Sequence, residues 1–158
     1  MRINIRKASI DYLEKCAQIL EKSELGQMYF TNNVGKYIGS HLLQEGFDKQ
    51  EIYVALKEDE CIGFIWLQLT GIFHWFPYIH VVIVDAEYQG NGIARKLMDF
   101  VEDLARQDHS DRVFLMVGDY NKNAISTYIH MGYTQVGSVP SLFVKGVDEL
   151  IMMKLFKD

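Results

Sequence analysis

The sequence predicts a mixed α/β domain with helices on both faces of one sheet. Short apolar runs typical of strands alternate with amphipathic stretches typical of helices along the 158 residues. Two of these runs, VVIV at 81–84 and RVFLMV at 112–117, are almost continuously apolar. Such runs are typical of strands that are covered on both faces. The expected order is therefore βα, α, β, β, β, α, β, α, β, β.

The first half of the chain contains a strand, two helices and three further strands. Ile3, Ile5 and Ala8 predict the first strand, and Ser9 is placed to cap the helix that follows. That helix carries Tyr12, Leu13, Cys16, Ile19 and Leu20 at helical spacing, and a looser segment follows at 25–33. A second helix is expected over roughly 32–45, with Val34, Tyr37, Ile38, His41 and Leu42. Strands are then expected at 51–57 and 61–69 around a tight turn at 58–60, followed by an aromatic connection at 71–77 and a strand at 78–84.

The second half contains the clearest helix of the chain. Its apolar residues form one stripe that comprises Ile93, Leu97, Phe100, Val101, Leu104 and Ala105. A buried strand at 112–117, a short helix at 123–131 ended by Gly132, and two strands at 133–139 and 149–156 complete the chain. Neither an internal repeat nor a linker divides the sequence, so we expect a single domain over residues 1–158.

Composition and charge exclude several classes of protein. Hydrophobic residues make up 49% of the chain and charged residues 23%, which indicates a soluble globular protein. The net charge of -5 argues against nucleic-acid binding, and polar residues interrupt the apolar region at 61–84, which argues against a membrane span. The only cysteines, Cys16 and Cys61, form neither a disulfide framework nor a metal-ligand spacing. We therefore expect a cytoplasmic protein with no metal.

The stretch VDAEYQGNGIARKL at 84–97 places two glycines where a strand gives way to a helix. Unpaired backbone N–H groups and the helix dipole favour an anion at a helix N-terminus, and Gly90 and Gly92 let a ligand approach the backbone. Arg95 and Lys96 add positive charge to a helix start that normally prefers acidic residues. Two interpretations are open at this point: a phosphate site, or a plain turn in which the glycines only reverse the chain.

Two motifs extend this pattern to a known family. Residues 89–94, QGNGIA, match Arg/Gln-x-x-Gly-x-Gly/Ala, and residues 121–133, NKNAISTYIHMGY, match Asn-x-x-Ala-x-x-x-Tyr-x-x-x-Gly-Phe/Tyr. Both resemble signatures of the GNAT N-acetyltransferase superfamily, and the resemblance covers nearly the whole chain but is weakest in its first fifty residues. It implies a single domain with a central, mixed, mostly antiparallel sheet of about six or seven strands, flanked by about four helices.

The resemblance also implies acetyl-CoA as the donor and a set of residues that bind it. The pyrophosphate would lie on the backbone of the glycine turn, pantetheine would run beside the preceding strand, and an N–H near Val82 or Ile83 would stabilise the oxyanion. Asn121 would hydrogen-bond pantetheine, cap its helix, or do both. The implied cofactor-binding residues are Val82, Ile83, Val84, Gln89, Gly90, Asn91, Gly92, Ile93, Ala94, Arg95 and Asn121.

Two residues are candidates for proton transfer. Tyr128 stands at the general-acid position of the family and would protonate the departing thiolate, although it also fits a core stripe with Ala124 and Met131. His80 would relay the proton of the attacking amine, or else is an ordinary hydrogen-bonded strand histidine, and Tyr78 on the same face would instead position a water. The aromatic residues Tyr29, Phe30, Phe73, Trp75 and Phe76 fit an acceptor pocket, a core or a dimer surface equally well.

The implied function is acetyl transfer from acetyl-CoA to a primary amine, with a small-molecule acceptor favoured, by direct attack in a ternary complex. Acetylation of a protein N-terminus or lysine is one alternative, and a non-catalytic acyl-CoA-binding regulatory module is another. The surplus of acidic residues suits a cationic acceptor. Homodimers occur in such families, but no feature of this sequence indicates one.

Overall fold

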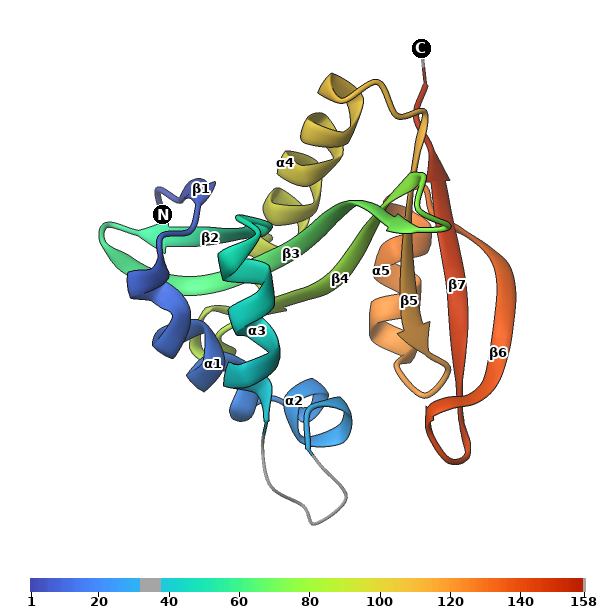
Figure 1. Cartoon of the computed structure of the whole chain (residues 1–158), viewed down its shortest axis with the longest axis horizontal. Helices are drawn as coiled ribbons and strands as arrows, with labels where there is room; N and C mark the ends of the chain where they lie inside the picture. Colours follow the sequence, from blue (N-terminus) through green and yellow to red (C-terminus); the bar gives the residue numbers. More distant parts are fainter. Residues whose placement is uncertain (32–37, 158) are drawn as a thin grey trace. The chain divides into compact units, whose positions relative to one another are not determined.

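The computed structural model describes residues 1–31 and 38–157. The elements in chain order are β1 (Asn4–Lys7), the 3-10 helix η1 (Ile10–Tyr12), α1 (Leu13–Glu21), α2 (Glu24–Tyr29), α3 (Gly39–Asp48), β2 (Ile52–Lys57), β3 (Glu60–Ile72), β4 (Phe76–Val84), the 3-10 helix η2 (Ala86–Tyr88), α4 (Ile93–Gln107), β5 (Arg112–Gly118), α5 (Lys122–His130), β6 (Thr134–Val144) and β7 (Val147–Leu155). Figure 1 shows these elements along the chain.

The strands form one seven-stranded sheet in the order β1-β2-β3-β4-β5-β7-β6. The pairs β1–β2, β2–β3, β5–β7 and β6–β7 are antiparallel, whereas β4 and β5 are parallel. The predicted fold class, a mixed α/β fold with a mostly antiparallel sheet, is confirmed. The chain divides into two compact units, Met1–Leu67 with Val81–Val101, and Gln68–His80 with Glu102–Asp158. Each unit is described by itself.

The N-terminal helices differ from the prediction in two places. The segment at 25–33 was expected to be loose, but its first part lies in α2 because the Ser23 hydroxyl accepts a hydrogen bond from the Gly26 N–H at 2.9 Å and caps the helix. Ser9, the predicted cap, precedes only the 3-10 turn η1, and its side chain makes no capping bond. The α-helix therefore begins later, at Leu13.

The helix expected over 32–45 corresponds in part to α3. In the described part of the chain this helix begins at Gly39 and continues to Asp48, three residues beyond the expected end. His41 and Leu42 lie in it as expected. Val34 and Tyr37, which were assigned to the same helix, lie outside the described residues.

The aromatic connection predicted at 71–77 is mostly strand. β3 runs through Ile72 and β4 begins at Phe76, so only a tight turn separates them. The Trp75 N–H donates to the Ile72 carbonyl at 3.1 Å, and φ is +57° at Phe73 and +55° at His74. Positive φ at both central positions is the pattern of a type I′ hairpin turn, which normally takes Asn and Gly. The sequence lacks those residues here, and the turn was therefore missed.

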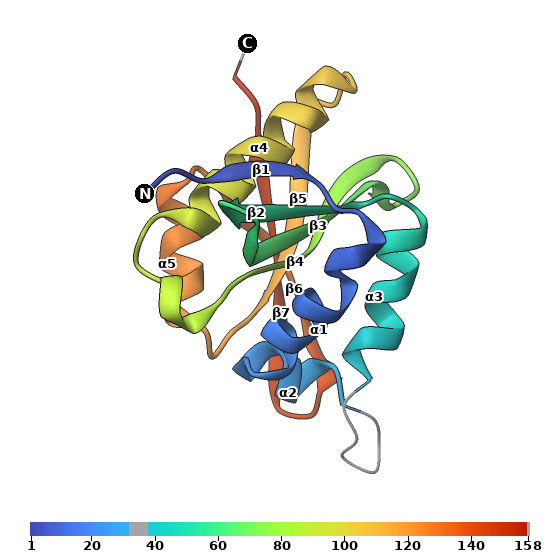
Figure 2. The same ribbon diagram turned by 90° about the vertical axis from the view of Figure 1, so that its left-hand side faces the viewer.

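The first unit is built in three layers. Helices α1 and α3 lie on one side of strands β2 and β3, and α4 begins on the other side (Figure 2). The α1–α3 side holds a hydrophobic core, which buries Cys16, Ala17, Ile19, Leu20, Phe30, Leu43, Phe47, Ile52, Val54, Leu56, Cys61, Phe64, Trp66, Val81 and Ile83. On the opposite side, Tyr53 of β2 contacts Phe100 of α4 with ring centroids 5.4 Å apart.

The two cysteines meet in this core although 45 positions separate them in sequence. Their Sγ atoms lie 3.9 Å apart, and both thiols are free and buried. The hydrogen bond with Cys61, together with burial, raises the pKa of the Cys16 thiol. The two cysteines thus pack as small core side chains whose thiols hydrogen-bond to each other.

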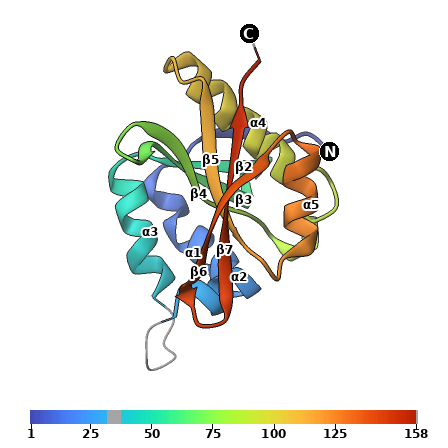
Figure 3. The same cartoon turned by 90° about the vertical axis from the view of Figure 1, so that its right-hand side faces the viewer.

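The second unit joins β5, β7 and β6 with α5 alongside (Figure 3). A buried polar group, Glu102 near the C-terminal part of α4, ties this unit together. Its carboxylate accepts hydrogen bonds from the Tyr133 hydroxyl at 3.0 Å and from Lys154 Nζ at 2.6 Å. Only 1% of the Glu102 side chain is exposed, against 20% of the Lys154 side chain, so the buried carboxylate depends on its two hydrogen-bond partners.

Replacing Lys154 by Met should destabilise the protein by about 2–3 kcal/mol, because it leaves the Glu102 carboxylate buried with one partner fewer. The free energy of unfolding in urea measures the loss. Lys49→Met is the matched control: the Lys49–Glu45 pair has a similar distance of 2.7 Å, but both side chains are 57% exposed. The control should change little, since exposed pairs add little stability. Equal losses in the two variants would contradict the role given to burial.

Candidate functional site

The turn between β4 and α4 is anchored at its start. Asp85 follows β4, and its N–H donates to the Ile62 carbonyl of β3 at 2.8 Å. The Asp85 carboxylate accepts from the Glu87 N–H at 3.1 Å and so begins the short 3-10 turn η2. Acidic side chains at such a position satisfy backbone donors that lack a helical partner. The chain therefore leaves the sheet in a fixed direction.

Polar side chains hold the glycine turn from within. Gln89 Nε2 donates to the Val84 carbonyl at 3.2 Å, and Asn91 Nδ2 donates to the Tyr88 carbonyl at 2.9 Å. The Tyr88 hydroxyl in turn donates to Glu60 at 3.2 Å. These bonds use side-chain amides and a phenol to shape the turn.

The two glycines are required by backbone conformation and not by packing. φ is +81° at Gly90 and +73° at Gly92, a region that disfavours residues with a Cβ. A Cβ built on either residue would meet no atom within 4 Å, so the space beside both glycines is open. Both earlier interpretations, turn and ligand site, need the positive φ. The open space beside the backbone is what a ligand site needs in addition.

Helix α4 begins immediately after this turn. The Lys96 N–H donates to the Gly92 carbonyl at 3.1 Å, which makes Gly92 the N-cap. The N–H groups of the first turn therefore have no acceptor inside the helix. No acidic residue lies in this turn, and the side chains of Arg95 and Lys96 are exposed. Open glycines, uncommitted helical N–H groups and basic side chains form an electropositive surface suited to a phosphate.

The strand that leads into the turn is largely buried. Ile83 and Val84 are buried, and Val82 is half-buried. Next to them on β3, a Cβ on Gly63 would come within 2.8 Å of the Ile83 carbonyl oxygen. Glycine at position 63 is therefore needed for the close approach of β3 to this part of β4.

In the second unit, Asn121 caps α5 and Tyr128 lies within it. The Asn121 side chain accepts from the Ala124 N–H at 3.2 Å, which confirms its predicted capping role. The Tyr128 ring is half-buried and lies 5.9 Å from the Tyr133 ring. Burial raises the pKa of Tyr128 to about 12. The phenol is therefore protonated at neutral pH and able to donate a proton, but not to accept one.

The raised pKa of Tyr128 predicts a loss of stability in alkali. Its pKa is about 12 in the folded chain and about 10 when unfolded, so the native state is favoured while the phenol is protonated. The unfolding free energy should then fall by about 2 kcal/mol as pH rises from 10 to 12. Tyr128→Phe should remove this part of the decline, as measured by urea unfolding across that range. Curves for wild type and variant that stay parallel above pH 10 would show that Tyr128 titrates normally.

His80 and Tyr78 lie on one face of β4 in the second unit. Tyr78 is opposite Phe114 of β5 in the parallel pairing, and its ring centroid is 5.8 Å from that of His80. The His80 side chain is exposed, whereas Tyr78 is half-buried. Burial, with a smaller contribution from the charge of Glu149, raises the pKa of Tyr78 to about 12. Tyr78 is thus a proton donor at neutral pH.

The predicted site residues fall into two groups. Val82–Val84 and Gln89–Arg95 belong to the first unit, whereas His80, Asn121 and Tyr128 belong to the second. Within the first unit the structure brings the strand end and the glycine turn together, through the bond from Gln89 to Val84.

The aromatic candidates separate by burial. Phe30 is a core residue and Tyr29 packs against that core. Phe76 contacts Phe114 with centroids 5.7 Å apart, while Phe73 and Trp75 at the hairpin turn are each 74% exposed.

Sequence reasoning missed two buried carboxylates, Glu102 and Glu149. Glu102 lies in α4, and the apolar stripe predicted for this helix does not include it. Glu149 begins the apolar run ELIMMKLF on the last strand. An acidic residue at the head of an otherwise apolar strand is the signal that would have indicated it, because strand side chains alternate and its face continues with Ile151 and Met153.

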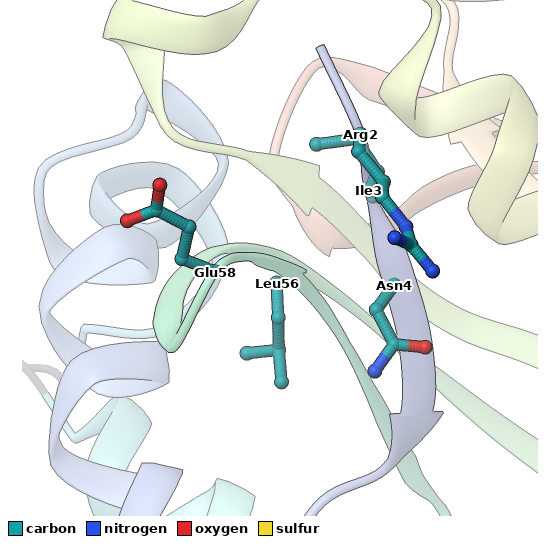
Figure 4. Close-up of a pocket in the computed structure, with 5 residues that line it drawn as sticks. All are labelled: Arg2, Ile3, Asn4, Leu56 and Glu58. Atoms are coloured by element: carbon teal, nitrogen blue, oxygen red, sulfur yellow. The ribbon is translucent and has the colours of Figure 1, made fainter.

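Other features of the described residues carry no comparable chemistry. A hollow in the first unit is lined by Arg2, Ile3, Asn4, Leu56 and Glu58, but the charged groups of Arg2 and Glu58 point away from each other (Figure 4). In the described ranges, no three His, Cys, Asp or Glu side chains are grouped so that they could hold a metal ion. None of the helices described here has the length and apolar character required to cross a membrane.

The fold and the glycine turn together define a mixed α/β protein with an open, electropositive helix N-terminus shortly after β4. More specifically, the chain belongs to the acetyltransferase (GNAT) family, whose family model matches residues 13–133. The resemblance inferred from the two sequence motifs is thereby confirmed.

Individual relatives extend the comparison. The chain is 31% identical over 98 residues to mycothiol acetyltransferase of Brachybacterium faecium, covering 61% of this chain and 30% of that protein. It is 28% identical over 103 residues to human N-alpha-acetyltransferase 30, covering 64% of this chain and 28% of that protein. The crystal structure of PaiA N-acetyltransferase from Thermoplasma acidophilum in complex with coenzyme A has a TM-score of 0.76 and 22% identity, and covers 99% of this chain and 100% of that one. The chain spans less than half the length of the curated relatives it matches.

Proposed function

We propose that this protein transfers an acetyl group from acetyl-CoA to a primary amine, in a single domain over residues 1–158. The observation that carries the proposal is the turn at 89–94, where two positive-φ glycines leave open space beside the start of α4. Membership of the GNAT family supports it, as does a structural neighbour solved with coenzyme A.

In this proposal the N–H groups from Gln89 to Ala94 bind the pyrophosphate, and Arg95 adds charge. The backbone of Val82–Val84 pairs with pantetheine, and one of its N–H groups stabilises the oxyanion. Asn121 contributes a hydrogen bond in addition to its cap. The phosphate chemistry explains why basic side chains follow Gly92 where acidic ones would stabilise the helix better.

The reaction forms one C–N bond and breaks one C–S bond. The amine nitrogen attacks the acetyl carbonyl carbon, and the thiolate of coenzyme A departs. Tyr128 donates its proton to the sulfur, a role that its raised pKa permits because the phenol stays protonated at neutral pH. His80 accepts the proton that the amine loses, since its exposed imidazole on β4 can exchange protons with solvent.

We propose a small-molecule amine as the acceptor. The net charge of -5 favours a cationic amine of either kind, and the mycothiol acetyltransferase relative is named for a small-molecule acceptor. A protein N-terminus is the second candidate, favoured by the relative named as an N-alpha-acetyltransferase. Two free, buried thiols suit the reducing conditions of the cytoplasm, where we propose that the protein works.

A screen of amines with detection of free thiol tests the proposal. Purified protein, acetyl-CoA and a panel of small amines and short peptides with free N-termini should release coenzyme A with at least one acceptor. A preference for peptides would select the second candidate acceptor. Binding of acetyl-CoA without thiol release for any acceptor would reject catalysis and indicate a non-catalytic acyl-CoA-binding module.

A further inference from the structure

Cys16 and Cys61 are two buried thiols of the first unit that the proposed reaction does not use. Cys16 lies in α1, Cys61 is the second residue of β3, and 0% and 2% of their surfaces are exposed. Their Sγ atoms lie 3.9 Å apart and share a hydrogen bond, whereas the sulfur atoms of a disulfide lie about 2 Å apart. An approach of about 2 Å would therefore join a helix and a strand that are 45 positions apart in sequence. The chain has no other cysteine that could compete for either sulfur.

The two thiols differ in their readiness to react. The hydrogen bond from Cys16 lowers the pKa of the Cys61 thiol, against an opposing effect of burial, and the same hydrogen bond raises the pKa of Cys16. Cys61 is therefore the first to lose its proton, and the thiolate is the form that attacks an oxidant. Cys61 also directly follows three exposed residues, 58–60, at the end of the β2–β3 hairpin. Local opening of this hairpin end gives a small oxidant access to the Cys61 sulfur.

Cys61 also lies beside the residue that anchors the glycine turn. The carbonyl of the next residue, Ile62, accepts the hydrogen bond from the Asp85 N–H at 2.8 Å. The Cys61 thiol itself donates to the Gly63 carbonyl at 3.5 Å. A movement of the Cys61 sulfur toward α1 breaks this contact and draws the beginning of β3 out of the plane of the sheet. A bond between the two sulfurs therefore disturbs the hydrogen bond that fixes the direction in which the chain enters the turn.

We propose that Cys16 and Cys61 form a reversible redox switch, in which a peroxide converts the two thiols into a disulfide that weakens the binding of acetyl-CoA. With hydrogen peroxide, the Cys61 thiolate attacks one oxygen, the O–O bond breaks, and the other oxygen leaves as water after taking up a proton. The Cys16 sulfur then attacks the sulfenic acid of Cys61, which forms the S–S bond and releases a second water. The two thiols together lose two hydrogen atoms, and a dithiol reductant restores them. The effect on acetyl-CoA rests on the proposed function, whereas the cross-link does not.

Thiol counting and peptide mapping test the cross-link without any cofactor. The full chain is treated with hydrogen peroxide, the remaining peroxide is removed with catalase, and free thiols are titrated after denaturation. Both thiols should disappear together, and digestion should release a peptide in which Cys16 is joined to Cys61. Dithiothreitol should restore both thiols. Thiols that remain free, or oxidised thiols without the joined peptide, would overturn the inference.

Calorimetry with acetyl-CoA, whose sulfur is blocked, measures the consequence of the cross-link. The affinity of the oxidised chain should fall about fivefold, because the turn loses one anchoring hydrogen bond, and dithiothreitol should restore it. The double variant Cys16→Ala, Cys61→Ala is the matched control and should bind acetyl-CoA equally before and after peroxide. Oxidised methionine would lower the affinity of both proteins and would not respond to dithiothreitol. An equal loss in the double variant would overturn the inference, and if that variant does not fold, a loss in the wild type that dithiothreitol cannot reverse does so.

The two measurements separate this inference from the proposed function. An affinity for acetyl-CoA that stays unchanged once the cross-link has formed would overturn the switch and leave acetyl transfer intact. A reduced chain that binds no acetyl-CoA would reject the proposed function and, with it, the effect on the cofactor. The thiol count would still decide whether Cys16 and Cys61 form the cross-link.

Discussion

Tyr128→Phe should lower kcat for acetyl transfer by about 100-fold or more and leave the affinity for coenzyme A unchanged. The substitution removes one oxygen from a half-buried ring, so the packing of Tyr128 against Tyr133 is kept. What is lost is the proton that the departing thiolate receives. Single-turnover kinetics measure the chemical step directly, and calorimetry with coenzyme A measures the affinity.

Tyr53→Phe is the matched control for the loss of a tyrosine hydroxyl. Tyr53 is also half-buried, its pKa is also raised chiefly by burial, and its ring also packs against another aromatic ring. Tyr53 lies on β2 and belongs to no proposed site, so the kcat of Tyr53→Phe should match that of the wild type. An unchanged single-turnover rate in Tyr128→Phe would remove Tyr128 from the mechanism and return it to its other interpretation as a core aromatic residue.

The parts of the fold that could be predicted are those with strong periodicity. The stripe of α4 and the apolar runs of β4 and β5 were placed nearly to the residue, because each pattern reflects burial on one or two faces. The failures are local. The turn at Phe73 and His74 adopts positive φ without glycine or asparagine, and α2 depends on a single serine cap. Tertiary context outweighed local propensity at the hairpin turn, whereas at α2 the sequence interpretation overlooked a local helix cap.

The candidate site was predictable where its chemistry resides in the backbone. Gly90 and Gly92 are visible in the sequence because positive φ excludes most other residues, and their conformation is as that argument requires. The buried Glu149 left only a weak signal, its place at the head of an apolar strand. Its burial depends on pairing between β5 and β7, which are separated by α5 and β6 along the chain, and local periodicity does not report such long-range pairing.

Gly92→Val should weaken coenzyme A binding by about 10- to 100-fold, because a branched side chain would fill the open space beside the helix N-terminus and displace a charged ligand from its N–H donors. The substitution also forces a branched residue to φ of +73°, which costs about 1–2 kcal/mol of stability. A loss of affinity by itself would not separate these two effects. Calorimetric titration with coenzyme A and urea unfolding of the same sample measure both.

Gly146→Val is the control for the loss of stability that positive φ alone causes. Gly146 lies in the turn between β6 and β7 with φ of +84°, and a Cβ there would also meet no atom within 4 Å. The two variants should therefore lose similar stability, while only Gly92→Val loses affinity for coenzyme A. Arg95→Gln adds a charge test: if a pyrophosphate occupies the turn, its affinity should fall and become less sensitive to salt, because one charge pair is removed. Wild-type affinity in Gly92→Val, at a stability equal to that of Gly146→Val, would place the cofactor elsewhere on the protein.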